Sequence, residues 1–214
     1  MVVRNVRHHG TAKNHTGSFP SYLMPGVWVR YESLIELDML RILEIERNVV
    51  RYLTQPFTTD DKYTPDMQVF RRGRRNLIIE CKPEDKLENA HTRQQIDRGE
   101  RWADDNDHDF MVVTDADLRG GGGHYLANAT LLWRYRHRRL PAPFIDDCMR
   151  AVAHLGDAAS IEALAVYLAQ AAPSFHPTPV IYNLIFHHML ATDLTRPLGS
   201  ESPLWAERLD AREG

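Results

Sequence analysis

The stretch from Tyr63 to Lys82 restricts the fold of this chain more than any other, because it has the pattern of a β-hairpin. Asp66 follows a proline at its start, Glu80 and Lys82 end it, and Gly73 lies between two pairs of arginines. Positions 66 and 80 are equally distant from position 73, so a turn at Gly73 sets Asp66 opposite Glu80 across an antiparallel pair. Side chains alternate along a strand, which places Glu80 and Lys82 on the same face. The sequence therefore predicts two carboxylates and a lysine at one place.

The flanking residues predict that this hairpin belongs to a larger sheet. The run Leu77–Ile79 is continuously apolar, as expected of a central strand that is covered on both faces. A polar helix is expected from about Asn89 to Asn106, and another buried strand from Asp109 to Asp115. This strand, helix, strand order is that of a crossover between two parallel strands.

A helix is expected upstream, from Tyr31 to about Arg47, where the chain has helix-forming residues and neither glycine nor proline. In it Glu36 is followed at helical spacing by Met39, Leu40 and Leu43, so its carboxylate lies within an apolar stripe that faces the core. Glu32 precedes it by one turn on the same side. A buried carboxylate needs a compensating positive group. The alternative, in which Glu36 lies at the edge of the stripe and reaches solvent, is equally open at this point.

These residues suit a magnesium site. Magnesium prefers oxygen ligands in octahedral geometry and keeps several waters, so Asp66, Glu80 and the backbone carbonyl of Cys81 form an incomplete cage, with Glu36 as a further ligand. Manganese is expected to substitute for magnesium. Lys82 would stabilise the charge that builds up on a phosphate under attack. The competing interpretation is a surface salt bridge between Lys82 and one of the acids; an apolar run directly before Glu80 argues against it.

Composition sets the wider limits. With 214 residues, 43% hydrophobic and 26% charged, the chain has room for one full core and a small second domain. We expect an irregular basic arm over residues 1–26, a catalytic domain over residues 27–140, and a C-terminal domain over residues 144–214 after a proline-rich boundary. Only two cysteines occur, which we expect to be reduced thiols. No apolar run approaches the length of a membrane span, so we expect a cytoplasmic protein.

Basic side chains gather at two places, where we expect contacts to the DNA backbone. The first is the hairpin tip, and the second is the end of a helix expected from Tyr125 to Arg139. The candidate DNA-binding residues are Arg71, Arg72, Arg74, Arg75, Arg134, Arg136, Arg138 and Arg139. Three further candidates for the site are Glu32, Gln94 and Gln95, although a solvated helix face explains the glutamines equally well.

The C-terminal part has the order of a winged helix. Helices are expected at about Phe144–Leu155, Ser160–Ala171 and Thr178–Leu190, followed by a hairpin that pairs residues 191–195 with residues 203–209. The third helix is apolar and has no arginine or lysine, whereas a base-reading helix normally presents polar side chains. Both DNA binding and protein docking therefore remain open for this part.

The acidic and lysine positions resemble the PD-(D/E)xK nuclease superfamily, an α/β class whose restriction-endonuclease-like core is a mixed sheet flanked by helices. A more specific resemblance, over roughly residues 4–118, is to the N-terminal domain of TnsA, the endonuclease subunit of heteromeric transposases. It rests on the segments Gly17–Ser21, Tyr31–Glu36, Gln55–Phe57, Tyr63–Asp66 and Glu80–Pro83.

This resemblance implies a magnesium-dependent DNA endonuclease with Glu36, Asp66 and Glu80 as its acidic residues and Lys82 as its lysine. It implies cleavage of double-stranded DNA at the 5′ ends of a transposon, beside a TnsB-like transposase and a TnsC-like ATPase. It also implies a winged-helix C-terminal domain. Two alternatives are a stand-alone nuclease of the superfamily in restriction or repair, and a non-catalytic DNA-binding adaptor with the same fold.

Overall fold

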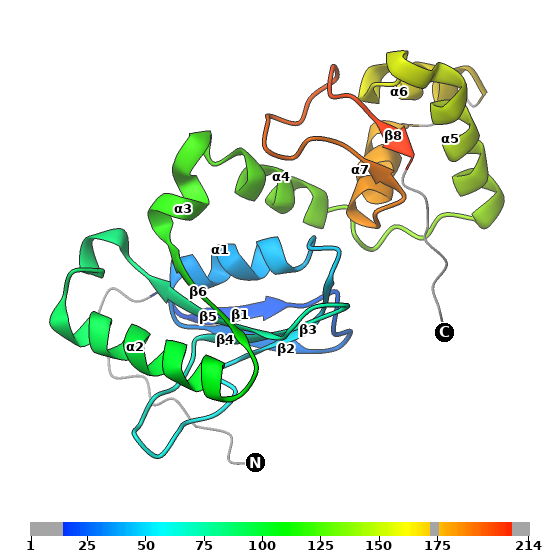
Figure 1. The fold of residues 1–214 in the computed structure, drawn as a ribbon. Helices are drawn as coiled ribbons and strands as arrows, with labels where there is room; N and C mark the ends of the chain where they lie inside the picture. Colours follow the sequence, from blue (N-terminus) through cyan, green and yellow to red (C-terminus); the bar gives the residue numbers. More distant parts are fainter. Residues whose placement is uncertain (1–14, 172–175, 207–214) are drawn as a thin grey trace.

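The computed structural model describes residues 15–171 and 176–206, which form a larger part built on a sheet and a smaller, helical C-terminal part (Figure 1). Four strands make the main sheet, in the order β3-β4-β5-β6. The first three are antiparallel neighbours, and the last pair is parallel. Their bounds are β3 Val49–Thr54, β4 Met67–Arg71, β5 Leu77–Lys82 and β6 Asp109–Thr114. The fold is therefore mixed α/β, as expected of a restriction-endonuclease-like core.

The register of β4 and β5 confirms the hairpin centred on Gly73. Met67 pairs with Ile79 and Val69 with Leu77, so paired positions are symmetric about residue 73. Gly73 itself has a φ of 66°, a left-handed conformation that favours glycine at the turn. Strand β5 is central and buried along almost its whole length. Strand β6 is at the edge of the sheet, with one neighbouring strand, and it is less buried than we expected.

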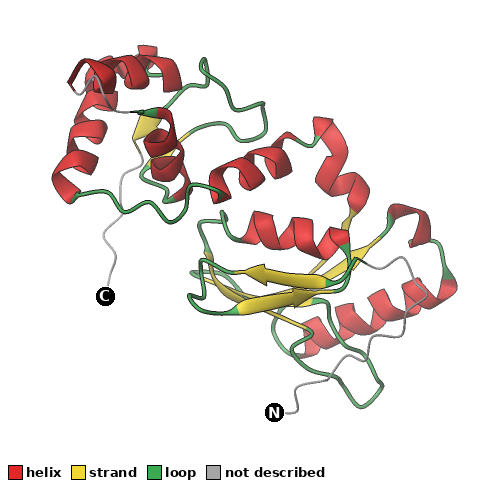
Figure 2. Ribbon diagram, turned by 180° about the vertical axis from the view of Figure 1, so that it is seen from behind, coloured by secondary structure: helices red, strands yellow, loops and turns green. Residues whose placement is uncertain are grey.

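The sheet lies between two helices (Figures 1 and 2). On one face is α1 (Leu34–Leu43), which is shorter than expected at both ends. It begins later because Ser33 caps it: the Ser33 hydroxyl accepts from the N–H of Glu36. On the other face is α2 (Ala90–Asp105), which agrees with the predicted range to one residue at each end and is capped by Asn89. The short helix η1 (Glu84–Lys86) precedes α2, and β6 leads into α3 (Asp115–Arg119), η2 (Gly120–Gly122) and α4 (His124–Trp133).

Our expectation of an irregular arm through residue 26 is wrong for part of that range. Gly17–Pro20 forms β1, which pairs in antiparallel register with β2 (Trp28–Tyr31). Phe19 is buried in the core beneath this pair and contacts Trp133 at a ring separation of 5.0 Å. Burial of this aromatic ring explains why the segment is ordered. Residues 1–14, including His8 and His9, lie outside the described residues.

The helix expected to reach Arg139 ends at Trp133, so the basic cluster follows the helix and is not on it. Two contacts from α7 (Thr178–Phe186) and the residue after it account for this ending. The Nδ2 of Asn183 donates to the carbonyl oxygen of Tyr135 at 2.7 Å, and a ring nitrogen of His187 lies 3.0 Å from the carbonyl oxygen of Arg136. These partners replace hydrogen bonds that a continuing helix would make.

The C-terminal part contains α5 (Ala142–Leu155), η3 (Gly156–Ala158), α6 (Ile161–Ala171), α7, and the pair β7 (Leu190–Ala191) and β8 (Trp205–Ala206). Three helices and a hairpin thus occur in the predicted order, although α7 is shorter than expected. Residues 207–209 of the expected hairpin lie outside the described residues. The winged-helix interpretation stays a prediction.

Two hydrophobic cores meet at α4. One lies between the main sheet and α1, and the other lies among α5, α6 and α7. From α4, Ala129 and Leu132 are buried in the C-terminal core, while Leu126 packs against the core of the sheet. Trp133 contacts both cores. Both cysteines, Cys81 and Cys148, are free thiols, as predicted, and both are buried. Across the described ranges no helix has the length and hydropathy of a membrane span.

Candidate active site

The hairpin brings Asp66, Glu80 and Lys82 together where β4 begins and β5 ends, as predicted. The ammonium of Lys82 lies 2.6 Å from Glu80 Oε2 and 3.1 Å from Asp66 Oδ2. Asp66 Oδ2 also accepts from the backbone N–H of Cys81 at 2.8 Å. Glu80 is 1% exposed, whereas Asp66 and Lys82 are only partly covered. The cluster is therefore a nearly buried group with one open side, which is not the geometry of a surface salt bridge.

Tyr63 holds the second oxygen of Glu80. Its hydroxyl donates to Glu80 Oε1 at 2.7 Å, and its ring is buried. Room for this ring comes from Gly99 in α2, where a Cβ would lie 2.5 Å from the tyrosine oxygen and 2.6 Å from Phe110. A glycine inside a helix costs about 1 kcal/mol relative to alanine, so its presence here is explained by the approach of Tyr63. Sequence reasoning assigned Tyr63 no role, although this glycine was a signal for a close contact with the helix.

Glu36 is buried, as one of the two sequence interpretations required. Its oxygens accept from the N–H of Glu32 at 2.8 Å and from the hydroxyl of Ser33 at 3.0 Å. Its carboxylate is close enough to Asp66 for repulsion between the two to contribute to its pKa. Glu36 is thus held at the start of α1 by Ser33 and by the backbone N–H of Glu32.

Burial controls the protonation of this site. It raises the pKa of Glu36 to about 7, with repulsion from Asp66 adding to the effect. It also raises the pKa of Glu80 to about 7, where Asp66 adds to the rise while Lys82 and Tyr63 oppose it. Burial works against the charged form of Lys82, but Asp66 and Glu80 outweigh it and raise the pKa of the lysine. The ammonium therefore stays charged over the physiological range.

The donor set fits magnesium. Within residues 15–171 and 176–206, no three His, Cys, Asp or Glu side chains are grouped so as to hold a metal ion by themselves. Magnesium usually takes only one or two carboxylates and fills its other positions with waters, so Asp66 and Glu80 suffice as side-chain ligands. The N–H of Cys81 points towards Asp66, and in an extended strand the carbonyl of the same residue points to the same side. The carbonyl of Cys81 therefore faces the same space as the carboxylates.

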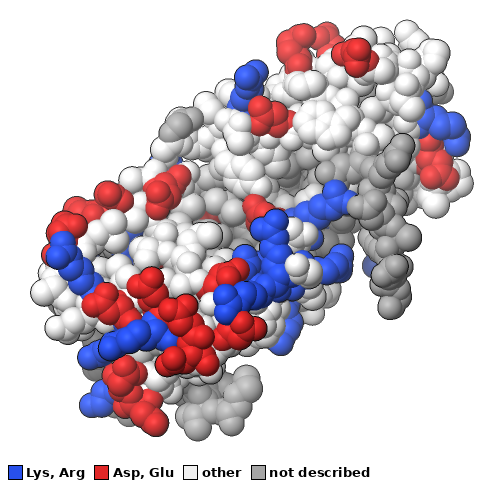
Figure 3. Space-filling view, in the orientation of Figure 1, with Lys and Arg blue, Asp and Glu red and all other residues white. Residues whose placement is uncertain are grey.

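The arginines of the hairpin tip differ in their contacts, and their expected role in DNA binding stays a prediction. Arg71 pairs with Asp109, and Arg75 donates to Asp107 at 2.8 Å, so both are held by acids at the start of β6. Arg72 and Arg74 are exposed and make no ion pair within the described part of the chain. Over α2 acidic and basic side chains alternate, whereas basic ones gather towards the junction with the C-terminal helices (Figure 3).

The four arginines of the second basic cluster, which follows α4, differ in their exposure. Arg134, Arg138 and Arg139 are exposed. Arg136 is half-buried, stacks on the ring of Trp133 at 3.3 Å and donates to its carbonyl oxygen at 2.8 Å. Of the two glutamines on α2, Gln94 is exposed and Gln95 is half-buried, and neither hydrogen-bonds to the acids in the described structure.

The segment that builds this site matches a known family. Residues 39–115 match the family model described as TnsA-like endonuclease N terminal. This segment is therefore similar to the N-terminal domain of TnsA-like endonucleases. No protein among those with curated descriptions matches the chain.

The matched residues of the TnsA-like domain run from within α1 to the end of β6, and they include Asp66, Glu80 and Lys82. The match begins after Glu36, and it is shorter than the range of residues 4–118 over which we expected the resemblance. An endonuclease of the TnsA type is consistent with the acid and lysine cluster that the fold assembles.

Proposed function

We propose that the chain is the metal-dependent DNA endonuclease subunit of a heteromeric transposase, and that it hydrolyses a phosphodiester at the 5′ ends of a transposon. The observation that carries the proposal is the nearly buried cluster of Asp66, Glu80 and Lys82 within the TnsA-like segment. A buried group of two acids and a lysine with one open side is uncommon as a purely structural feature, because replacement by apolar residues is often as stable.

Each residue has a role that follows from its position. Asp66, Glu80 and the Cys81 carbonyl would hold Mg²⁺ or Mn²⁺, which when bound supplies Lewis-acid activation and neutralises phosphate charge. Lys82, which stays protonated, stabilises the negative charge that develops on the phosphate. Glu36 keeps acceptor capacity beyond the two hydrogen bonds that it accepts, so it would be a further ligand or hold a metal-bound water.

Contacts to DNA would come from the available cations. Arg72 and Arg74 at the hairpin tip, together with Arg134, Arg138 and Arg139, are exposed and suited to phosphates, which position a duplex without reading its sequence. The partners in this proposal are a TnsB-like transposase for the 3′ ends and a TnsC-like ATPase that contacts the C-terminal part. The domain limits at residues 26 and 140–144 belong to the same proposal.

A cutting assay with and without the partner proteins tests this function. A DNA fragment with a labelled transposon end is incubated with the chain and Mg²⁺, alone and with the transposase and ATPase, and the 5′ nick is mapped. We expect cutting that requires both Mg²⁺ and the partners. Cutting by the chain alone would favour a stand-alone nuclease, and binding of DNA without any Mg²⁺ binding in calorimetry would favour an adaptor.

Tyr63→Phe is expected to weaken Mg²⁺ binding about tenfold while the protein stays folded, because residues that orient a metal ligand typically affect affinity by 10- to 100-fold. The variant removes the hydrogen bond to Glu80 Oε1 and leaves the ring in place. Isothermal titration calorimetry with Mg²⁺ measures the effect.

Tyr125→Phe is the matched control. The Tyr125 hydroxyl also donates to a glutamate, Glu46, at 2.7 Å, but away from the cluster. Both variants lose about 1 kcal/mol of stability from one hydrogen bond, and only Tyr63→Phe should change Mg²⁺ affinity. Equal Mg²⁺ affinity in the two variants would show that Tyr63 does not position a ligand.

A further inference from the structure

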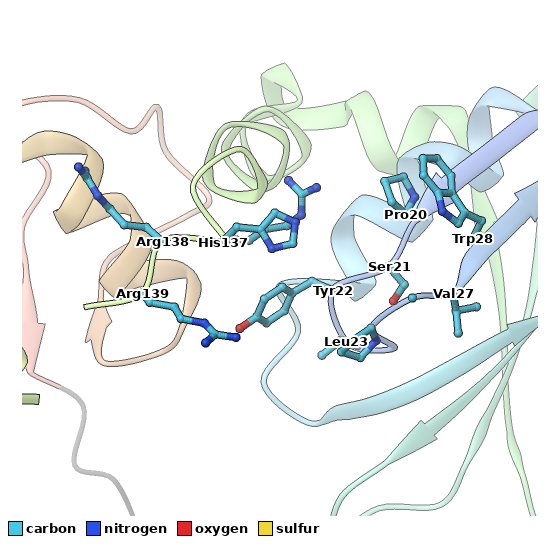
Figure 4. Close-up of a pocket in the computed structure, with 12 residues that line it drawn as sticks. Pro20, Ser21, Tyr22, Leu23, Val27, Trp28, His137, Arg138 and Arg139 are labelled. Carbon is cyan, nitrogen blue, oxygen red and sulfur yellow. The ribbon is translucent and has the colours of Figure 1, made fainter. Parts of the chain in front are cut away.

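A pocket of about 670 Å³ lies where the β1–β2 loop faces the segment that follows α4 (Figure 4). Its size is in the range of small-ligand sites, and such sites often occur at junctions between parts of a protein. Its lining residues come from these two segments alone: Pro20, Ser21, Tyr22, Leu23, Pro25, Gly26, Val27, Trp28, Arg136, His137, Arg138 and Arg139.

The basic side chains that line this pocket favour an anionic ligand. Arginines at positions 136, 138 and 139 line it together with His137, and none of its lining residues is acidic. Arg138 and Arg139 are exposed and form no ion pair with any described residue. The Nε of Arg136 is buried and has no hydrogen-bond partner in the described structure. A ligand with several acceptor oxygens would satisfy these donors.

The pocket also presents aromatic surface. Trp28 is 67% exposed, the largest exposed fraction among the exposed large hydrophobic side chains. Tyr22 lies on the opposite side, close to Arg139 (Figure 4), and its ring is fixed edge-on by Phe186 and His187 at 5.3 Å each. Tyr22 is half-buried against the C-terminal core, so Trp28 supplies the exposed ring. An exposed aromatic ring beside a basic groove is a feature on which unpaired bases stack.

The base of the pocket is tied to the helix that carries Glu36. Glu44 at the end of α1 accepts from the Ser21 hydroxyl at 2.6 Å and from the N–H groups of Tyr22 and Leu23 at 2.8 and 3.2 Å. Glu44 follows Glu36 by eight residues, which is about 12 Å along a helix. This is the rise of about four nucleotides in one strand of a duplex.

We propose that this pocket binds a short unpaired segment of the DNA strand on which the active site acts, with phosphates at Arg138 and Arg139 and a base against Trp28. The inference rests on the proposed nuclease function and adds a subsite to it. A nucleotide accounts for both the cations and the exposed indole, whereas an acidic peptide would account for the cations alone.

Binding of DNA by a variant that cannot cut tests the proposal. Full-length protein with Asp66→Ala is titrated, in magnesium-free buffer, into a fluorescein-labelled duplex with a single-stranded tail and into the same duplex with blunt ends, followed by anisotropy. We expect tighter binding of the tailed duplex. Trp28→Ala and the double variant Arg138→Ala/Arg139→Ala should each reduce that preference about tenfold, the scale of one lost base stack.

Arg150→Ala is the matched control, because Arg150 is exposed on α5 and lies outside the pocket. It should leave the preference for the tail unchanged, and Trp28→Phe, which keeps an aromatic face, should retain most of it. Equal binding of tailed and blunt duplexes, or competition by polyglutamate that does not depend on Trp28, would overturn the assignment. The cutting assay described above tests the nuclease function separately. If the protein does not cut DNA but still prefers the tailed duplex, the proposed nuclease function is wrong and the proposed binding role of the pocket stands.

Discussion

Lys82→Ala is expected to lose about 10²- to 10³-fold of Mg²⁺-dependent DNA cutting, the usual effect of removing one group that stabilises transition-state charge. In the folded protein this ammonium contacts both acids, at 2.6 and 3.1 Å. Without it the pKa of Glu80, already raised by burial to about 7, rises further, and the folded protein takes up a proton. The fold should therefore survive, because Glu80 becomes neutral and no unpaired charge stays buried. Initial rates of nicking, with circular dichroism as a check on folding, measure the effect.

Lys86→Ala provides the comparison for Lys82→Ala. Lys86 lies four residues further on, is mostly exposed and pairs with Asp85. The substitution Lys86→Ala removes one positive charge from the same region of the chain without affecting Asp66 or Glu80. The rate of cutting should therefore change less than about threefold, because an exposed ion pair such as Lys86–Asp85 contributes little energy. Similar losses in both variants would mean that the cluster contributes only general charge.

Glu44→Ala is expected to lower the free energy of unfolding by about 3 kcal/mol, because it leaves several buried donors without an acceptor. The carboxylate is 3% exposed and accepts from Ser21, Tyr22, Leu23 and, at 2.5 Å, from the hydroxyl of Tyr52. Urea denaturation measures the loss. Glu44→Gln, which keeps the shape and one acceptor oxygen, should lose less.

Glu100→Ala is the control for Glu44→Ala, since Glu100 is exposed on α2. Its substitution should change stability by less than about 0.5 kcal/mol, as is usual for surface positions. Because Glu44 holds the base of the pocket, Glu44→Ala should also weaken the preference for tailed DNA. A stable Glu44→Ala variant would mean that water or a rearranged loop replaces the carboxylate.

The site could be predicted where it depends on local register. The equal distance of Asp66 and Glu80 from Gly73 was enough to predict that these two residues lie together. A hairpin turn fixes the pairing of the strands, and the pairing fixes which side chains are neighbours. Burial of Glu36 was open in the sequence and was decided by its partners in the preceding residues, Glu32 and Ser33.

Contacts between distant segments could not be predicted. Nothing in the spacing of Arg71 and Arg75 indicates that Asp107 and Asp109 hold them, because that contact forms only when the crossover returns β6 to the sheet. The end of α4 at Trp133 likewise depends on Asn183 and His187, which follow it by about fifty residues in the chain. Tertiary contacts overrode local helix propensity at that point.

The position of α4 between the two cores has a consequence for how the molecule unfolds. Ala129 and Leu132 are buried against the C-terminal helices, whereas Leu126 packs against the core of the sheet. Neither the sheet part nor the C-terminal part therefore keeps all of its apolar contacts when the other part unfolds. Differential scanning calorimetry should therefore give one heat-absorption peak with equal calorimetric and van't Hoff enthalpies. The amides of α4 should exchange with deuterium only through global opening. A chain truncated before α5 would leave this helix with an uncovered apolar stripe and a tendency to self-associate.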